Sequence, residues 1–322
     1  METYWADAVK YLSAGICMGF GAIGAALGEG YTAGQTALGI SRQRLASAQL
    51  LKTMLIGQAI TETSGIFALV IAILMISTDL GAGESVPLRM GALLGAGISV
   101  GIAGFGVAIG VGYCAGRTCE GVARRPGIGA QIMGTMLVGQ AVAETPIIFA
   151  LVVTFILLYT GFTGGLEKAA ALLGSGICMG LGAFGSGIGG GLPGGTACSA
   201  VARREDLRGK ILGTMLIGQA VTQTASILAL VVSFLLIFMS APGDSLVRIS
   251  ALLSAGICMG LGAIGPGYGC GIPAGSACTA VRINEHAASV ITRVMLVGQA
   301  VAQSTAIYSL IIALLMMFVV RA

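Results

Sequence analysis

Charge is scarce in this chain: Asp, Glu, Lys and Arg make up 9% of its 322 residues, whereas soluble domains carry about 25%. Aromatic residues make up 6%, histidine occurs once, and no long basic run is present that could follow a phosphate backbone. The composition argues against a soluble enzyme and against a nucleic-acid partner. Eight cysteines occur without any CxxC pair, so neither a zinc site nor a disulfide framework is indicated.

Apolar residues and glycine are abundant instead. The chain is 56% apolar, contains 53 glycines and has a mean hydropathy of +0.96. Eight membrane spans of about 20 residues fit into its length. The N-terminal segment lacks a basic n-region, so we expect the first span to be retained rather than cleaved as a signal peptide.

The tripeptide GQA recurs at Gly57, Gly139, Gly218 and Gly298 and divides the chain into four units. Each unit has a Gly-rich apolar span, a short basic stretch and a second apolar span. We therefore predict an all-α membrane protein of four tandem helical hairpins, with eight helices in total. The predicted hairpins cover residues 1–79, 80–162, 163–242 and 243–322.

The first span of every unit keeps four glycines in register, which in the first unit are Gly24, Gly28, Gly30 and Gly34. Small residues let helix backbones approach closely within a membrane. Because these glycines lie on several faces, the pattern favours a ring of helices that each touch two neighbours. A generic membrane dimer face is the alternative.

Positive charge is concentrated inside the hairpins. Their loops and adjacent helix ends hold twelve of the 17 Lys and Arg residues. Loops rich in Lys and Arg remain on the cytoplasmic side, so we predict cytoplasmic hairpin loops. Both termini and the three links between hairpins, near residues 78–87, 160–167 and 241–244, are then predicted on the other side.

Three carboxylates lie deep inside apolar spans: Glu29, Glu62 and Glu144. A charge there costs a few kcal/mol, so each is a functional candidate. Glu62 and Glu144 occupy equivalent positions, which the last two units fill with Gln223 and Gln303. The first-span position 33 residues upstream is predicted at the same depth and reads Glu29, Val111, Gly190 and Cys270.

A desolvated carboxylate is stable when it is protonated or coordinates a cation. A hydroxyl follows each key position, at Thr63, Thr145, Thr224 and Ser304, so Na⁺ is a candidate ion beside H⁺. Oxygen ligands for Na⁺ are expected at Glu29, Glu62 and Thr63, whereas Val111 favours a proton at Glu144 unless neighbours lend oxygens. Gln223 and Gln303 cannot ionise, so they are spacers or ligand donors. The GQA residues, including Gln58 and Gln140, are either auxiliary ligands or amides that join helices.

The strings GQAITETSGIFALVIA, GQAVAETPIIFALVV and GQAVAQSTAIYSLIIAL resemble the ion-carrying helix of the proteolipid, or c subunit, of rotary F-type ATP synthases and their V-type relatives. The loops SRQR, ARRP and ARRE resemble the loop that meets the central stalk in that family. Their residues are Arg42, Gln43, Arg44, Arg124, Arg125, Arg203 and Arg204. The fourth loop, VRIN, departs from this pattern.

The resemblance implies roles for single residues. Glu62 and Glu144 match the ion-binding carboxylate, and Thr63 and Thr145 match the hydroxyl ligand of sodium-binding members. The carbonyls of Ile60 and Val142 match the backbone ligand, and Tyr308 matches a tyrosine that latches the site. Glu29 stands where those members usually have Gln.

The resemblance also implies partners and a mechanism. The expected partners are further copies of the chain in a rotor ring, other proteolipids of the family, the stator a subunit with its arginine, the central stalk and membrane lipid. The expected function couples Na⁺ or H⁺ transport to ATP synthesis or hydrolysis, without a cofactor or an active site of the chain's own. A bacterial plasma membrane is the expected location. Because only two of the four hairpins are expected to carry an ion, we predict fewer ions per ATP than in a ring where every hairpin carries one.

Two other classes of protein share some of these features. A secondary transporter built from repeats could place carboxylates at the membrane midplane, although inverted repeats or interrupted helices are typical of that class. A purely structural membrane oligomer would explain the glycines but not Glu62 and Glu144.

Overall fold

The computed structural model describes residues 2–77 and 85–320, with side chains from residue 7 onward. All regular structure in these ranges is helical, which confirms the predicted all-α class. The first predicted link lies mostly outside the described residues. The ten α-helices are α1 Glu2–Arg42, α2 Ser47–Ser77, α3 Val86–Arg124, α4 Gly129–Ala143, α5 Thr145–Tyr159, α6 Leu166–Val201, α7 Arg208–Thr222, α8 Thr224–Phe238, α9 Leu246–Ile283 and α10 Ala288–Phe318.

These helices form eight segments that are long and apolar enough to cross a membrane, as the sequence predicted. Hairpin 1 is α1 and α2, hairpin 2 is α3 with α4 and α5, hairpin 3 is α6 with α7 and α8, and hairpin 4 is α9 and α10. A single turn of 3₁₀ helix lies in each hairpin loop.

Two of the predicted helices are interrupted, and both breaks fall at a key position. A turn at Glu144 separates α4 from α5, and a turn at Gln223 separates α7 from α8. Pro146 has no N–H to donate, and the N–H of Ile147 instead donates to the Glu144 carbonyl over 3.1 Å. At the second break, Ser226 Oγ donates to the Gln223 carbonyl over 2.7 Å.

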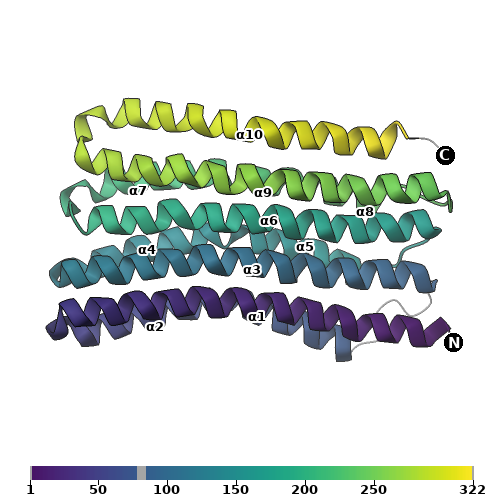
Figure 1. Ribbon diagram of the computed structural model, residues 1–322, viewed down its shortest axis with the longest axis horizontal. Helices are drawn as coiled ribbons and strands as arrows, with labels where there is room; N and C mark the ends of the chain where they lie inside the picture. The colour runs from purple at the N-terminus through teal and green to yellow at the C-terminus, as the bar shows by residue number, and fades with distance from the viewer. Residues whose placement is uncertain (1, 78–84, 321–322) are drawn as a thin grey trace.

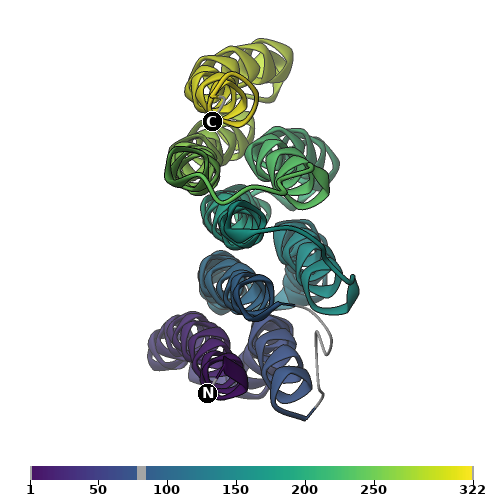
Figure 2. The same cartoon turned by 90° about the vertical axis from the view of Figure 1, so that its right-hand side faces the viewer.

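The hairpins stack side by side in chain order and in one orientation (Figure 1). All four loops lie at one end, while α1 begins and α10 ends at the other. The Gly-rich helices α1, α3, α6 and α9 pack against one another in one layer, and the remaining helices form a second layer (Figure 2). The repeats are therefore parallel and not inverted.

Glycines allow the first layer to pack so closely. A Cβ atom added to Gly112 would overlap the backbone of Gly28, and Gly191 would overlap Gly110 in the same way. Gly271 repeats this contact against Gly189. The predicted packing role of these glycines is thus present at all three junctions between consecutive hairpins, with backbones in direct contact.

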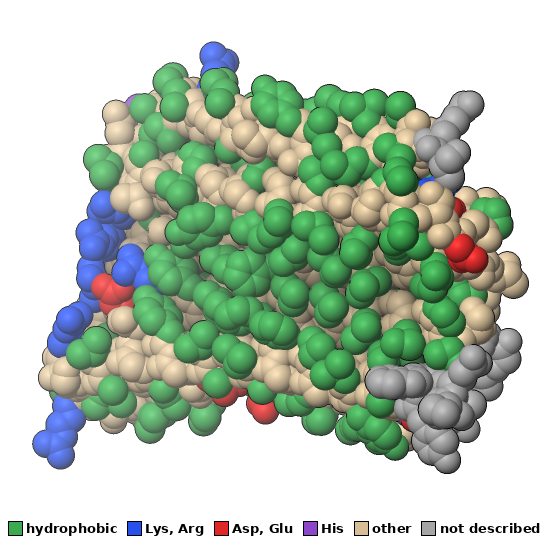
Figure 3. Space-filling view, turned by 45° about the vertical axis from the view of Figure 1, so that its right-hand side comes forward, with side chains coloured by type: hydrophobic (Ala, Val, Ile, Leu, Met, Phe, Trp, Pro, Cys, Tyr) green, Lys and Arg blue, Asp and Glu red, His purple; other side chains and the backbone are tan. Residues whose placement is uncertain are grey.

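The exposed surface matches a membrane environment. Figure 3 shows apolar side chains over the middle of the molecule, with Lys and Arg gathered at the loop end. Helices α3 and α6 are the most buried, whereas α10 is the least buried. Hairpins 1 and 4 therefore form two open edges of the stack.

Charged groups fasten hairpins 3 and 4 at the link end. Lys168 is 5% exposed, and its ammonium donates to the carbonyl of Met239 over 2.9 Å and to that of Ile237. Glu167, which is 3% exposed, pairs with Arg248 at 3.3 Å. The Lys168 contacts provide donors for backbone carbonyls at the end of α8. The ion pair holds the start of α6 against the start of α9.

Candidate functional site

The second layer carries one polar position per hairpin, midway along the membrane segments. These positions are Glu62 in α2, Glu144 between α4 and α5, Gln223 between α7 and α8, and Gln303 in α10. Glu62 is exposed on the open edge of hairpin 1, Glu144 is partly buried, and Gln223 is 6% exposed. Figure 3 shows acidic side chains midway along this edge.

Glu144 meets hairpin 1 rather than a residue of its own hairpin. Its Oε1 lies in hydrogen-bond contact with Thr63 Oγ1. The Thr63 hydroxyl also lies 2.6 Å from the carbonyl oxygen of Ile60. Three oxygens from two consecutive hairpins therefore converge at this junction, although the sequence grouped Thr63 with its neighbour Glu62.

The next two junctions repeat this geometry with an amide. Gln223 Nε2 donates to the carbonyl of Val142 over 2.9 Å, and Gln303 Nε2 donates to the carbonyl of Val221 over 3.1 Å. Thr145 Oγ1 donates to that same Val142 carbonyl over 2.9 Å. Glu144, Gln223 and Gln303 therefore each face the carbonyl and hydroxyl of the preceding hairpin.

The GQA glutamines lie one turn away and join helices. Gln219 Nε2 donates to the carbonyls of Gly139 and Gly190, both over 2.8 Å, and so bridges the preceding hairpin and the Gly-rich helix of its own. Gln140 and Gln299 make the equivalent pairs of hydrogen bonds. Gln58 makes only one, to the carbonyl of Glu29 over 3.1 Å.

The first-layer positions predicted at this depth do lie beside the second layer. The carbonyls of Glu29 and Val111 accept hydrogen bonds from Gln58 and Gln140, which places both backbones at equivalent points. The side chain of Glu29 is partly exposed and that of Glu62 is exposed. Among the described residues, neither carboxyl has a hydrogen-bond or ion-pair partner, so the site around Glu62 lacks ligands that the site around Glu144 has.

The remaining candidate auxiliary ligands, Ser304 and Tyr308, lie in α10 on the open edge that hairpin 4 forms. Ser304 Oγ donates to the carbonyl of Val301 over 2.7 Å, as Thr63 does to Ile60. Tyr308, one turn further along α10, is 63% exposed. Hairpin 4 therefore presents a carbonyl and a hydroxyl that no key residue of the same chain covers.

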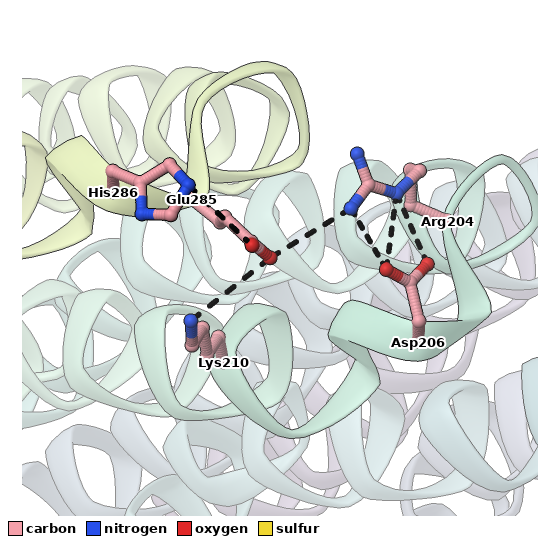
Figure 4. Close-up of polar contacts among 5 residues, drawn as sticks. All are labelled: Arg204, Asp206, Lys210, Glu285 and His286. Atoms are coloured by element: carbon pink, nitrogen blue, oxygen red, sulfur yellow. Dashed lines mark hydrogen bonds and ion pairs between the residues drawn. The ribbon is translucent and has the colours of Figure 1, made fainter.

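The hairpin loops are joined by ion pairs that the loop motifs alone did not reveal. Arg125 pairs with Glu205 at 3.2 Å across the second and third loops. Arg204 pairs with Glu285 at 3.7 Å across the third and fourth loops (Figure 4). The signal in the sequence is the spacing, because each acid lies 80 or 81 residues after its arginine. Arg42, Gln43 and Arg44 in the first loop have no such partner among the described residues.

Two loop arginines have opposite environments. A hydrogen bond to Asp206 raises the pKa of the Arg204 guanidinium above its ordinary value. Burial, and then the charge of Arg124, lower the pKa of Arg203. Both side chains remain charged at neutral pH. The loop end therefore presents positive charge beside acidic side chains that are already paired with arginine.

Comparisons with known proteins match this arrangement. The family model for the C subunit of ATP synthase matches four times, at residues 12–75, 94–157, 173–236 and 253–316, which together cover more than half of the chain. The ATP synthase c subunit of Campylobacter curvus is 44% identical over 72 residues, covering 22% of this chain and 72% of that relative. The protein of the same name from Helicobacter pylori (strain Shi470) is 39% identical over 95 residues, covering 30% and 90%.

Proposed function

The chain belongs to the family of ATP synthase C subunits, and from this premise we propose that its two ion carriers are Glu62 and Glu144. Each would bind H⁺ or Na⁺ and stay neutral while the turning rotor moves it through the membrane interior. It would release the ion when the rotor has turned. Gln223 and Gln303 stay neutral throughout. The chain thus carries two ions on four hairpins.

The contact between Glu144 and Thr63 is the observation that supports this proposal most directly. A hydroxyl has one hydrogen, and Thr63 lies 2.6 Å from the carbonyl of Ile60, to which it can donate that hydrogen. Thr63 could instead donate to Glu144, but that arrangement would leave a charged carboxylate within the membrane. With that hydrogen donated to Ile60, either the Glu144 carboxyl is protonated and donates to Thr63, or a cation lies among the three oxygens. Both arrangements neutralise Glu144 within the membrane.

The choice between H⁺ and Na⁺ depends on the number of oxygens. At the Glu144 junction, hairpin 1 supplies a carbonyl and a hydroxyl, while the adjacent Val111 is apolar and fully buried. At Glu62, a second carboxyl is available from Glu29. Hard cations such as Na⁺ take several oxygen ligands, so Na⁺ fits Glu62 better than Glu144.

The Glu62 site needs a second copy of the chain to be complete. Continuing the internal repeat by one hairpin places hairpin 4 of one copy against hairpin 1 of the next. The Val301 carbonyl and the Ser304 hydroxyl then reach Glu62, as Ile60 and Thr63 reach Glu144. The unused hydrogen of the Gln58 amide would reach the carbonyl of Gly298.

The two open edges support such a junction. A Cβ atom at Gly30 would meet nothing within 4 Å, whereas its equivalents Gly112, Gly191 and Gly271 overlap the preceding hairpin. Gly298 likewise has only one neighbour near the 4 Å limit. A groove of about 310 Å³ between α9 and α10, lined by Pro273 and Met295 among others, is left open beside it. We propose that α1 of the next copy fills this groove, so that copies close into a ring.

The proposed orientation places the loops in the cytoplasm and both termini on the other side. The loop end carries most of the Lys and Arg residues, which remain on the cytoplasmic side of membrane proteins. The loop residues Arg42, Arg44, Arg124, Arg125 and Arg203 would face the central stalk. The exposed helices of the second layer would face lipid and the stator a subunit.

Carbodiimide labelling of the purified ring tests the carriers. The reagent attacks a protonated buried carboxyl, so it should modify Glu62 and Glu144, and mass spectrometry would locate the products. Protection by Na⁺ would identify a sodium carrier, whereas slower labelling at high pH without any effect of Na⁺ would identify a proton carrier. Labelling of neither residue under any condition would contradict the proposal. Glu62→Gln and Glu144→Gln are the matched controls for each site.

A further inference from the structure

The three junctions within the chain share one half of an ion site. At each junction the preceding hairpin offers a backbone carbonyl and, three residues later, a hydroxyl that donates to it. The pairs are Ile60 with Thr63 at 2.6 Å, Val142 with Thr145 at 2.9 Å, and Val221 with Thr224 at 2.7 Å. Only the group that approaches from the next hairpin differs: a carboxyl at the first junction and amides at the other two.

Each amide donates to the carbonyl of the half site that it faces. Gln223 Nε2 lies 2.9 Å from the Val142 carbonyl, and Gln303 Nε2 lies 3.1 Å from the Val221 carbonyl. An amide N–H satisfies the carbonyl permanently, because it neither takes up nor releases a proton at neutral pH. The carbonyl therefore has a hydrogen-bond partner at these two junctions without any bound ion.

The junction around Gln223 is closely packed and has an unused polar atom. A Cβ atom at Gly190 would lie 3.3 Å from the Cα atom of Ala143 and 3.6 Å from Gln223 Nε2, so the glycine allows Ala143 and the amide to approach this helix closely. Gln223 Oε1 is buried and has no hydrogen-bond partner among the described residues. A buried acceptor without a partner is costly, and it indicates a place for one more polar ligand.

We propose that these two junctions are dormant ion sites, held closed by Gln223 and Gln303, and that a single Gln→Glu exchange opens either one. The inference rests on the proposed carrier function. Glu has nearly the shape of Gln but replaces the amide donor with an acceptor. A carboxylate facing the Val142 carbonyl and the Thr145 hydroxyl is stable only after it takes up H⁺ or Na⁺. Residue 223 thus sets the number of ions that each chain carries.

The variant Gln223→Glu in the intact ATP synthase complex tests this inference. Carbodiimide labelling should add residue 223 to Glu62 and Glu144, so that the number of labelled carboxyls per chain rises by half. The number of ions moved per ATP, measured in liposomes from the threshold gradient for ATP synthesis, should rise by the same factor. Gln223→Met is the control, since it removes the amide without adding a carboxyl.

The outcomes separate this inference from the carrier function. Labelling of Glu62 and Glu144 without labelling of residue 223 would overturn the dormant sites and leave the two carriers in place. A labelled residue 223 with an unchanged ion-to-ATP ratio would also overturn them. Loss of labelling at Glu62 and Glu144 in the unmodified chain would refute the carrier function itself.

Gln303→Glu repeats the test if Gln223→Glu does not assemble, because Val221 and Thr224 provide the same half site. The same rise by half in labelled carboxyls and in ions per ATP is expected. Failure of both variants to assemble would contradict the inference, since a site suited to an ion must accept its carboxyl.

Discussion

The packing of the Gly-rich layer predicts opposite effects for one substitution at two equivalent positions. At Gly185 in α6, an added Cβ atom would lie 2.5 Å from both the Cα and the carbonyl oxygen of Ile264 in α9. At Gly265, the equivalent position of hairpin 4, nothing lies within 4 Å. Gly185→Ala should therefore destabilise the folded chain, and Gly265→Ala should not.

The size of the effect follows from the contact. To restore an ordinary separation, α6 and α9 must part by about 1 Å, and such a gap forfeits roughly a quarter to a half of each dispersion contact. Overpacking of this kind costs about 1–3 kcal/mol. The higher helix propensity of Ala offsets about 1 kcal/mol, which leaves Gly185→Ala about 0–2 kcal/mol less stable. For Gly265→Ala there is no overpacking cost, so only the gain in helix propensity remains.

Unfolding of the detergent-solubilised chain by SDS, followed by far-UV circular dichroism, measures this difference. Native mass spectrometry of the ring adds a second readout. If copies join through hairpins 4 and 1, Gly265 meets Ile23 of the next copy, so Gly265→Ala should lower the yield of rings although it does not lower the unfolding midpoint of the chain. Equal midpoints for the two variants would refute the packing argument.

Three further outcomes are expected. Gln219→Leu removes two hydrogen bonds and should destabilise the chain by about 1–2 kcal/mol in SDS titrations. Gln58→Leu removes only one and should cost less, and equal costs would contradict the bridging role. Glu144→Gln should abolish carbodiimide labelling at residue 144 while the ring still assembles, and it should halve the number of ions moved per ATP, so that ATP synthesis in liposomes needs a steeper threshold gradient; an unchanged threshold would exclude Glu144 as a carrier. Glu285→Gln breaks the exposed pair with Arg204 and should leave the unfolding midpoint unchanged, which a titration at low and high salt would check.

Much of the fold follows from the sequence alone. Hydropathy and the GQA repeat predicted the eight spans, and the constant spacing of 33 residues placed Glu29 beside the second layer at the depth of Glu62. Both predictions depend on contacts within one hairpin, where helix geometry fixes which residues share a depth.

The contacts across the junctions between hairpins could not be predicted in the same way. Thr63 contacts Glu144 instead of forming a site with its neighbour Glu62, because the rotation between adjacent hairpins decides which faces meet. The break at Gln223 also had no sequence signal, since no proline follows it. The burial of Lys168 was not predicted from the sequence either, and the carbonyls at the end of α8 explain it.

The backbone contacts between hairpins carry a consequence for assembly. Gly28 with Gly112, Gly110 with Gly191, and Gly189 with Gly271 meet in nearly the same way, so none of these surfaces distinguishes one neighbour from another. Four separate hairpins held by these glycine contacts alone would join in random order and scatter the two acidic ones around the assembly. Joining them in one polypeptide fixes the sequence Glu, Glu, Gln, Gln in every copy. The covalent links thus supply the information on order that the packing surfaces lack.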